Sequence, residues 1–494
     1  MTGVDDERPV EQGFAVSGSI SAPLPAEDDG LARSAPSATG VDAAELLAFL
    51  DDVEAAGLEL HDLMIWRDGA VVAEAWRWPY GADRLRMTHS MTKSFTACAI
   101  GLLIDEGRLA LSDRVASFFP EAEIAPDTRQ ARMTVEDLLT MRSGHASEVS
   151  GSIWRGIETS WVREFFRIPV VYEPGTRHVY SSAASYMLSA IVTRITGETI
   201  EAYLTPRLFE PLGMAEVRWD VGPDGVNPGG NGISMRTADV LKLGILHAQH
   251  GVWQGRQILP RAWVEAATRA HGVPDYGYHW VVGDGYYAAL GVFVQMVMVF
   301  PEANAVIALN SAMDESRVLL PHLRRHFPTA FAGDGSAAAD AALADRLAGW
   351  PATPPLPSLA AGDAAALAGD WSVQDNILGI SAIRLEFDGD AMRLSLTDAE
   401  GEHGVVGGHE RWVETTTDLR GASLHHGYRL KDAPTVAGGH WIAANEYELV
   451  LHFVESAFRD TFRFRFARGE LAIERFVNIN SGDRAWPLLT AVRA

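Results

Sequence analysis

The chain has 494 residues, a hydrophobic fraction of 47% and a formal net charge of −24. This length predicts about three domain-sized units, or one large domain with a smaller one, each with a sizeable core. The acidic balance argues against nucleic acid and anionic membrane surfaces as partners, because both require a basic face.

No targeting or membrane segment is evident in the sequence. The N-terminus reads Met1-Thr2-Gly3-Val4-Asp5-Asp6-Glu7, which is acidic where a secretory signal would be basic. No stretch reaches the ~20 apolar residues of a membrane span. The single cysteine, Cys98, excludes an internal disulfide and lies in an apolar helical run. We therefore expect a cytoplasmic protein.

The first ordered elements follow an acidic segment. Residues 1–38 are rich in Asp, Glu, Pro, Ser and Gly without periodicity, and we expect a disordered tail. Apolar residues at helical spacing predict a helix from Val41 to Gly57. The turn Arg67-Asp68-Gly69 between two apolar runs then predicts a β-hairpin. A helix is expected from Ser90 to Asp105, where apolar residues again recur at helical spacing.

Further elements are expected along the chain. Helices are predicted at 134–141, 182–196, 200–208, 237–247, 260–270 and 337–348, and a strand pair is predicted around the turn Pro301-Glu302-Ala303-Asn304. Strands near both ends of this region indicate a mixed fold, with a first domain at 39–349. Prolines cluster at 350–363 and predict a linker. In residues 364–494 the period changes to two, which indicates an antiparallel barrel or sandwich.

One of the few lysines stands at a position suited to chemistry. Of the 41 basic residues only Lys93, Lys242 and Lys431 are lysines, so Arg carries nearly all of the positive charge. Unlike Arg, Lys can give up its proton in a suitable environment. On a helix, Ser90 and Lys93 share a face, and Ser90 lies at the N-terminus, where negative charge is favoured. This spacing predicts a nucleophile and its base; the alternative is a helix cap beside a solvated cation.

The segments around this pair resemble the serine β-lactamase and penicillin-binding-protein-like hydrolases, in particular the class C and esterase branch. The resemblance runs from about Leu63 to Ser311. It rests on six segments in the family's order, namely 88–95, 103–113, 134–144, 180–188, 211–214 and 230–234. It implies a serine β-lactamase-like α/β (α+β) domain with an antiparallel sheet and a helical subdomain, which precedes the C-terminal lipocalin-like antiparallel β-barrel at 364–494.

The resemblance also implies roles for individual residues. Ser90 would be the nucleophile, with Lys93 and Tyr180 as general base and acid. A backbone N–H near Ala289 would be the second donor of the oxyanion hole. Ser182 stands where the family usually has Asn. No metal or other cofactor is expected.

The family's third active-site motif usually reads Lys-Thr-Gly or His-x-Gly. Residues Tyr286 to Gln295, called the third segment below, stand in its place and contain neither sequence. In β-lactamases and D-alanyl peptidases the cation of that motif helps to hold the substrate carboxylate. The sequence is closer to the family VIII esterases and 6-aminohexanoate-dimer hydrolases, with Tyr287 and Gln295 as candidate walls of a neutral pocket. Phe293 is expected to pack in the core.

The sequence therefore predicts a serine hydrolase that cleaves a small ester or amide through an acyl-enzyme on Ser90. One alternative is a D-amino-acid peptidase or β-lactamase-like amidase, and another is a non-catalytic binding protein on the same fold. A small molecule is the expected partner, and a homo-oligomer stays open. His322 and His326 have metal-compatible spacing, but we expect them on a solvated helix face.

Overall fold

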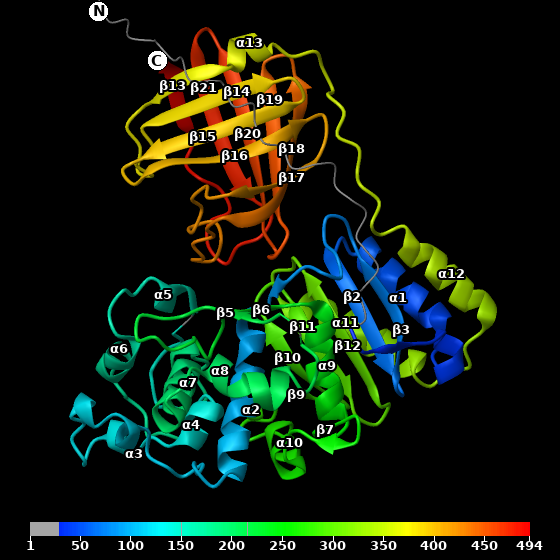
Figure 1. The fold of residues 1–494 in the computed structure, drawn as a ribbon, viewed down its shortest axis with the longest axis vertical. Coiled ribbons are helices and arrows are strands. Elements are labelled where there is room, and N and C mark those ends of the chain that lie inside the picture. The colour runs from blue at the N-terminus through cyan, green and yellow to red at the C-terminus, as the bar shows by residue number, and fades with distance from the viewer. Residues whose placement is uncertain (1–28, 150, 215) are drawn as a thin grey trace, which may run out of the picture.

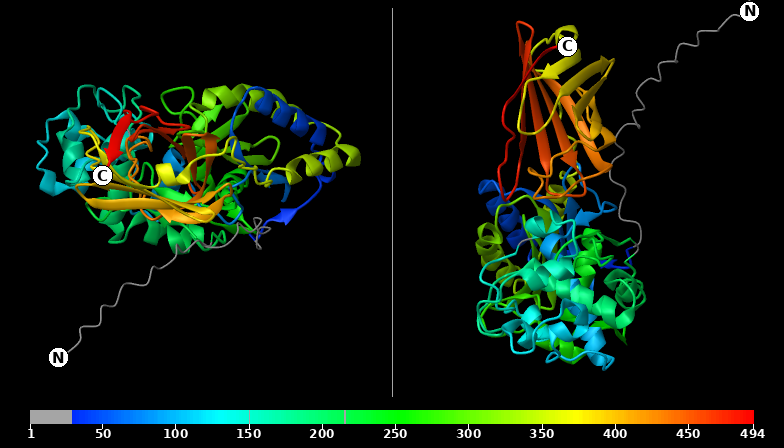
Figure 2. Two further views of the ribbon diagram at one scale, coloured as in Figure 1. Left: turned by 90° about the horizontal axis from the view of Figure 1, so that it is seen from above. Right: turned by 90° about the vertical axis from the view of Figure 1, so that its left-hand side faces the viewer.

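A computed structural model describes residues 29–149, 151–214 and 216–494 (Figure 1). The predicted architecture is confirmed: a mixed domain of helices around a largely antiparallel sheet is followed by a closed antiparallel β-barrel. Figures 1 and 2 show the barrel standing on one side of the larger domain, which makes the molecule elongated.

The larger domain is built on a seven-stranded sheet in the order β1-β3-β2-β12-β11-β10-β9. Its strands are β1 Ala32–Arg33, β2 Leu60–Arg67, β3 Ala70–Trp76, β9 Val281–Gly283, β10 Tyr286–Gly291, β11 Gln295–Phe300 and β12 Ala305–Ser311. All neighbouring pairs are antiparallel except β1 with β3. The expected hairpin around Asp68 and the strand pair around Pro301 are thus both present.

Helices cover both faces of this sheet. On one face, α1 (Ala43–Ala55), α11 (Ser316–Ala330) and α12 (Ala337–Ala348) bury their apolar residues against the strands. On the other face lie α2 (Thr92–Asp105) and α9 (Thr237–Ala248). Because the strands are buried on both faces, they are nearly continuous apolar runs rather than alternating ones.

The helical subdomain packs beside α2 and carries most of the irregular chain. Its elements are α3 Arg129–Arg132, α4 Val135–Leu139, α5 Gly151–Arg155, α6 Trp161–Arg167, α7 Ser182–Thr196 and α8 Ile200–Leu204, with the 3-10 helices Val115–Phe118 and Pro120–Ala122 and the π-helix Thr205–Phe209. Helix α10 Arg261–Ala267, the pair β7 Val252–Trp253 and β8 Arg256–Gln257, and the small sheet β4 Arg86–Met87, β6 Ile233–Met235 and β5 Arg218–Trp219 complete the domain.

The C-terminal strands form a ten-stranded sheet that closes on itself, because β16 also pairs with β18. The strands are β13 Gly369–Val373, β14 Ala382–Asp388, β15 Ala391–Asp398, β16 Gly401–His409, β17 Val413–Thr417, β18 Ala433–Ala443, β19 Glu446–Phe453, β20 Arg459–Ala467, β21 Glu470–Val477 and β22 Leu489–Arg493, and the short helix α13 Ala364–Leu367 precedes them. Buried aromatic and aliphatic side chains form the barrel's core.

Two sequence expectations need correction here. Residues 1–28 of the expected tail lie outside the described residues, but residues 29–38 are folded: Ala32–Arg33 is β1, and a 3-10 helix covers Pro36–Thr39. This segment lacks apolar periodicity because it is held by backbone pairing to β3.

His326 is also not on a solvated face, contrary to the sequence expectation. It is 4% exposed, and its ring nitrogens contact Glu45 and Asp52 of α1. The described residues include no group of three or more His, Cys, Asp or Glu that could hold a metal.

Candidate active site

Ser90 lies in a short 3-10 helix, His89–Met91, that leads directly into α2. The expected helix therefore begins two residues later than Ser90. His89 has a φ of 49°, which turns the chain sharply before the serine. A neighbouring strand holds this turn in place, because the Thr88 N–H and hydroxyl both donate hydrogen bonds to the Ile233 carbonyl of β6. Ser90 is consequently held at the edge between the sheet domain and the helical subdomain.

Lys93 contacts Ser90 directly. Its Nζ lies 3.1 Å from Ser90 Oγ, 3.2 Å from Ser182 Oγ and 2.8 Å from the Gly230 carbonyl oxygen. The side chain is 2% exposed, so bulk water does not compete for these contacts. A hydroxyl and an amine at this distance can exchange a proton.

Tyr180 is the third predicted residue that the structure brings to this point. Lys93 Nζ lies 4.7 Å from the centre of its ring. Tyr276 packs edge-on against Tyr180, with ring centres 6.4 Å apart. Burial and the neighbouring Tyr180 raise the pKa of Tyr276 well above its usual value, so this second phenol stays neutral.

Ser182 begins α7, with Ser181 as the N-cap that accepts from the Ala184 N–H. Buried His279 braces α2 and α7 behind Lys93. Its Nε2 lies 3.1 Å from Ser185 Oγ, and its carbonyl accepts from Ser94. Burial, together with the charge of Lys93, lowers the pKa of His279 to about 3, so it is a neutral spacer.

The third segment shows which of the predicted pocket residues reach the cavity. Leu290, Gly291 and Val292 at the end of β10 line a cavity of about 250 Å³ together with Ser90. A Cβ on Gly291 would lie 2.4 Å from the Thr88 carbonyl oxygen, so only glycine lets this strand end approach the serine turn. Ala289 itself is buried in the core, one residue before the lining segment.

Tyr287 and Gln295 are not among the residues that line this cavity. Tyr287 packs edge-on against Trp280 in the core, with ring centres 5.4 Å apart. Gln295 is 1% exposed and bonds the backbone of Ser311, which ties β11 to β12. Tyr287 lies four residues before Gly291 on the same face of β10, where its ring packs on Trp280. Gln295 lies opposite Gly291 on β11, but its amide is taken up by the carbonyls of Val292 and Ser311. Phe293 packs as expected, but in the barrel's core cluster.

The barrel supplies part of the cavity wall. His426 and Tyr428, from the loop between β17 and β18, line the cavity together with His89, Glu148, Arg155 and Asn231. The Tyr428 hydroxyl lies 3.0 Å from His89 Nδ1, next to the candidate nucleophile. The guanidinium of Arg155 stacks over the Tyr428 ring at 3.5 Å and donates to the His426 carbonyl.

A buried charge cluster fixes this barrel loop. His425 Nε2 lies 2.8 Å from one oxygen of Asp460 on β20, and Arg475 on β21 binds the other oxygen. Arg475 also donates to the carbonyl of Arg420. The loop is therefore anchored to barrel strands at two points that precede His426. His425 and His426 lie in a turn, where His425 binds Asp460 and His426 lines the cavity.

Sequence reasoning missed Arg155, Asn231 and His426 as cavity residues. Neither Arg155 nor His426 stands in a motif, since each reaches the cavity through tertiary packing alone.

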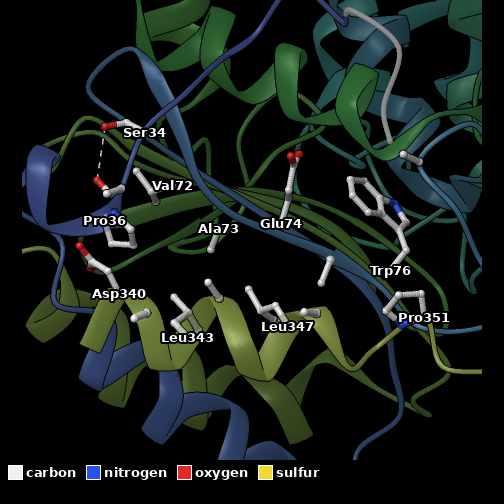
Figure 3. Close-up of a pocket in the computed structure, with 16 residues that line it drawn as sticks. Ser34, Pro36, Val72, Ala73, Glu74, Trp76, Asp340, Leu343, Leu347 and Pro351 are labelled. Atoms are coloured by element: carbon white, nitrogen blue, oxygen red, sulfur yellow. Dashed lines mark hydrogen bonds between the residues drawn. The ribbon is translucent and has the colours of Figure 1, made fainter. Parts of the chain in front are cut away.

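A larger cavity of about 710 Å³ lies between β3 and α12 and shares no lining residue with the Ser90 cavity. Figure 3 shows Leu343 and Leu347 of α12 facing Val72 and Ala73 of β3 across it.

Comparison with known proteins decides the family. Residues 50–326 match the profile of the family described as Beta-lactamase. The chain belongs to this beta-lactamase family. Protein Rv1367c of Mycobacterium tuberculosis is 33% identical over 168 residues, which cover 30% of this chain and 42% of that protein. The match thus spans less than half of that relative.

Two further proteins illustrate the likeness. Penicillin-binding protein 4 of Amycolatopsis lactamdurans is 26% identical over 46% of this chain and 72% of its own length. The solved structure named "Putative 6-aminohexanoate-dimer hydrolase from Bacillus anthracis" has a TM-score of 0.50 at 18% identity, over 58% of this chain and 81% of its own. The latter likeness shows the fold. Among the described residues, no helix has the length and apolarity to cross a membrane.

Proposed function

We propose that this member of the beta-lactamase family is a serine hydrolase that forms an acyl-enzyme on Ser90. The observation that carries the proposal is the contact of 3.1 Å between Lys93 Nζ and Ser90 Oγ, behind the wall of a cavity that Ser90 lines and a substrate can occupy. Family membership and the hydrolase names of its relatives support the reaction class.

In this mechanism Lys93 in its amine form accepts the Ser90 proton as Oγ bonds to the substrate carbonyl carbon. The tetrahedral intermediate then breaks the ester C–O or amide C–N bond. The leaving group takes up one proton, which Lys93 and Tyr180 relay. Water attacks the acyl-enzyme by the reverse route and releases the acid, which regenerates the Ser90 hydroxyl.

The negative oxygen of the intermediate needs donors opposite Lys93. We assign this role to the backbone N–H of Ser90 and to one N–H of the segment Leu290–Val292, which replaces the initial expectation at Ala289. The close approach of Gly291 to the serine turn supports this assignment, because it brings the strand end to the reacting atom.

The substrate class in this proposal is a small ester or amide, with the ester preferred. The cavity of about 250 Å³ favours a compact acyl group. The third segment has Ala289-Leu290-Gly291 where a cation would be needed for β-lactams or D-alanyl peptides. An amidase or D-amino-acid peptidase is the second candidate, supported by relatives named as D-alanyl-D-alanine carboxypeptidases. A cytoplasmic location and a small-molecule partner remain parts of the proposal.

The test is covalent labelling of the intact protein with a fluorophosphonate, followed by intact-mass and peptide analysis. We expect one adduct per chain, located on Ser90 and absent in Ser90→Ala. The same pair of proteins should differ by at least about 10³-fold in hydrolysis of a p-nitrophenyl ester. A folded protein that takes no label and cleaves neither esters nor amides would instead support the non-catalytic binding protein.

A further inference from the structure

Arg155, at the end of α5, has an unusual position for an arginine of this acidic chain. It lines the Ser90 cavity and also an adjoining groove of about 740 Å³ between the two domains. Its guanidinium donates to one backbone carbonyl and stacks on one phenol ring. Within residues 29–149, 151–214 and 216–494, no carboxylate lies within ion-pair distance of it.

At the junction of the two spaces, Arg155 therefore forms no direct ion pair with the described residues. Its Nε is buried and has no hydrogen-bond partner in the described part of the chain. The Asp220 carboxylate lines the groove and is close enough for Arg155 to lower its pKa, which burial raises, but the two groups form no ion pair. A half-buried guanidinium with a free donor favours an incoming carboxylate.

Two other groups of the same cavity are also left without partners. His89 Nε2 and Asn231 Oδ1 are buried and make no hydrogen bond to the described residues. Burial, with the nearby His426 and Arg155, keeps His89 neutral by lowering its pKa far below the usual value. Because buried polar atoms are nearly always satisfied by protein, water or ligand, these three groups around one cavity offer hydrogen bonds to a polar ligand.

We propose that Arg155 is the specificity-determining residue of the site and binds a carboxylate on the substrate close to the scissile carbonyl. This inference rests on the proposed function. In this proposal Arg155 of α5, which stacks on Tyr428 of the barrel, supplies the cation that is missing from residues 286–295. The preferred substrates are then esters or amides with an anionic group on either the acyl or the leaving side.

The experiment compares matched substrates that differ only by one charge. On the acyl side, mono-4-nitrophenyl glutarate is compared with its methyl ester. On the leaving side, 4-acetoxybenzoate is compared with methyl 4-acetoxybenzoate. For the wild-type protein we expect kcat/KM to favour the anionic member of at least one pair by about 10-fold or more, and the pair that responds identifies the side.

The variant Arg155→Gln should bring this ratio close to one, mainly through KM, whereas Arg155→Lys should keep part of the preference. Arg261→Gln on α10, where Arg261 is exposed and paired with Glu265, makes the same change in net charge and should keep the full preference. A purely structural Arg155 would predict equal losses for anionic and neutral substrates in both Arg155 variants, with the ratio unchanged.

The outcomes separate this inference from the function on which it rests. Hydrolysis of all four esters that depends on Ser90, with wild-type ratios near one, would overturn the role of Arg155 and leave the hydrolase intact. Absence of hydrolysis and of labelling at Ser90 would remove both. The wild-type comparison needs no variant, so misfolding of Arg155→Gln could not hide the answer.

Discussion

At the scale of single residues, the site depends on Lys93 having both a short reach and a removable proton. The side chain ends among three oxygens, and its burial leaves no room for a longer group. Arginine would keep the positive charge but could not act as a base, since its guanidinium stays protonated. Lys93→Arg therefore separates charge from basicity.

We expect Lys93→Arg to lower kcat for a p-nitrophenyl ester by about 10²- to 10⁴-fold, close to the loss in Ser90→Ala. Lys431→Arg, at an exposed position on the barrel, serves as the control and should retain activity. Thermal unfolding of both variants monitors the fold. Wild-type rates in a folded Lys93→Arg protein would reject Lys93 as the base.

The sequence was informative about these residues where the signal was local. Ser90 and Lys93 are three positions apart, and Tyr180 stands in a recognisable segment, so all three could be named in advance. Tyr287 and Gln295 do not line the pocket as expected, because the Tyr287 ring packs on Trp280 and the Gln295 amide bonds the backbone of Val292 and Ser311, and the sequence shows neither set of partners. Arg155 and His426 could not be found, since only packing between domains brings them to Ser90.

At the scale of elements, helical periodicity predicted α7 and α12 with their observed ends, and α1 and α9 within two residues. Closure of the barrel could not be derived, because it depends on a short parallel pairing of β16 with β18, at Gly408 and His409. The loop between β17 and β18 has no periodicity either. Its position is set by the buried cluster of Asp460, Arg475 and His425.

The Asp460 cluster leads to a prediction for this loop. Asp460 and Arg475 are both inaccessible to solvent, so Asp460→Asn would leave the guanidinium buried without its counter-charge. We expect the barrel's free energy of unfolding to fall by about 3–5 kcal/mol. Urea unfolding followed by tryptophan fluorescence measures the loss.

A matched control lies on the neighbouring strand. Glu446 pairs with Arg465 on the barrel surface, where the arginine side chain is 53% exposed. Glu446→Gln should cost less than about 1 kcal/mol, as is usual for exposed pairs. Equal small losses in Asp460→Asn and Glu446→Gln would contradict the anchoring role assigned to Asp460.

At the scale of the whole molecule, polar contacts join the domains beside the site. The Arg86 guanidinium donates to the Val454 carbonyl and contacts His61, and Glu59 pairs with Arg459 of the barrel. Burial is the main cause that lowers the pKa of His61 to about 4. Burial also lowers the pKa of His452, whose ring packs against Trp78 across the interface, to about 3. Away from the interface, burial lowers the pKa of His247 to about 4.

These buried histidines make folding sensitive to acid. A folded-state pKa below the unfolded value of about 6.5 means that the unfolded chain binds more protons between the two values. Stability is therefore complete above pH 7 and falls as the pH decreases from about 6.5 to about 4. For a fully buried group such as His247 the loss at pH 4 is on the order of 3 kcal/mol.

The variant His247→Phe tests this argument on one residue. The ring of His247 packs at a tilt against Trp280, with ring centres 4.4 Å apart, and its Nδ1 lies 2.9 Å from the Leu243 carbonyl oxygen. Phenylalanine therefore keeps the ring packing but loses this hydrogen bond and the titrating group. We expect the variant to be slightly less stable than the wild type at pH 7.5 and more stable at pH 4.5, in urea unfolding followed by tryptophan fluorescence. The two curves of stability against pH should therefore cross, because only the wild type must keep a buried histidine neutral in the folded state at low pH. Curves that stay parallel across this pH range would show that His247 does not contribute to acid unfolding.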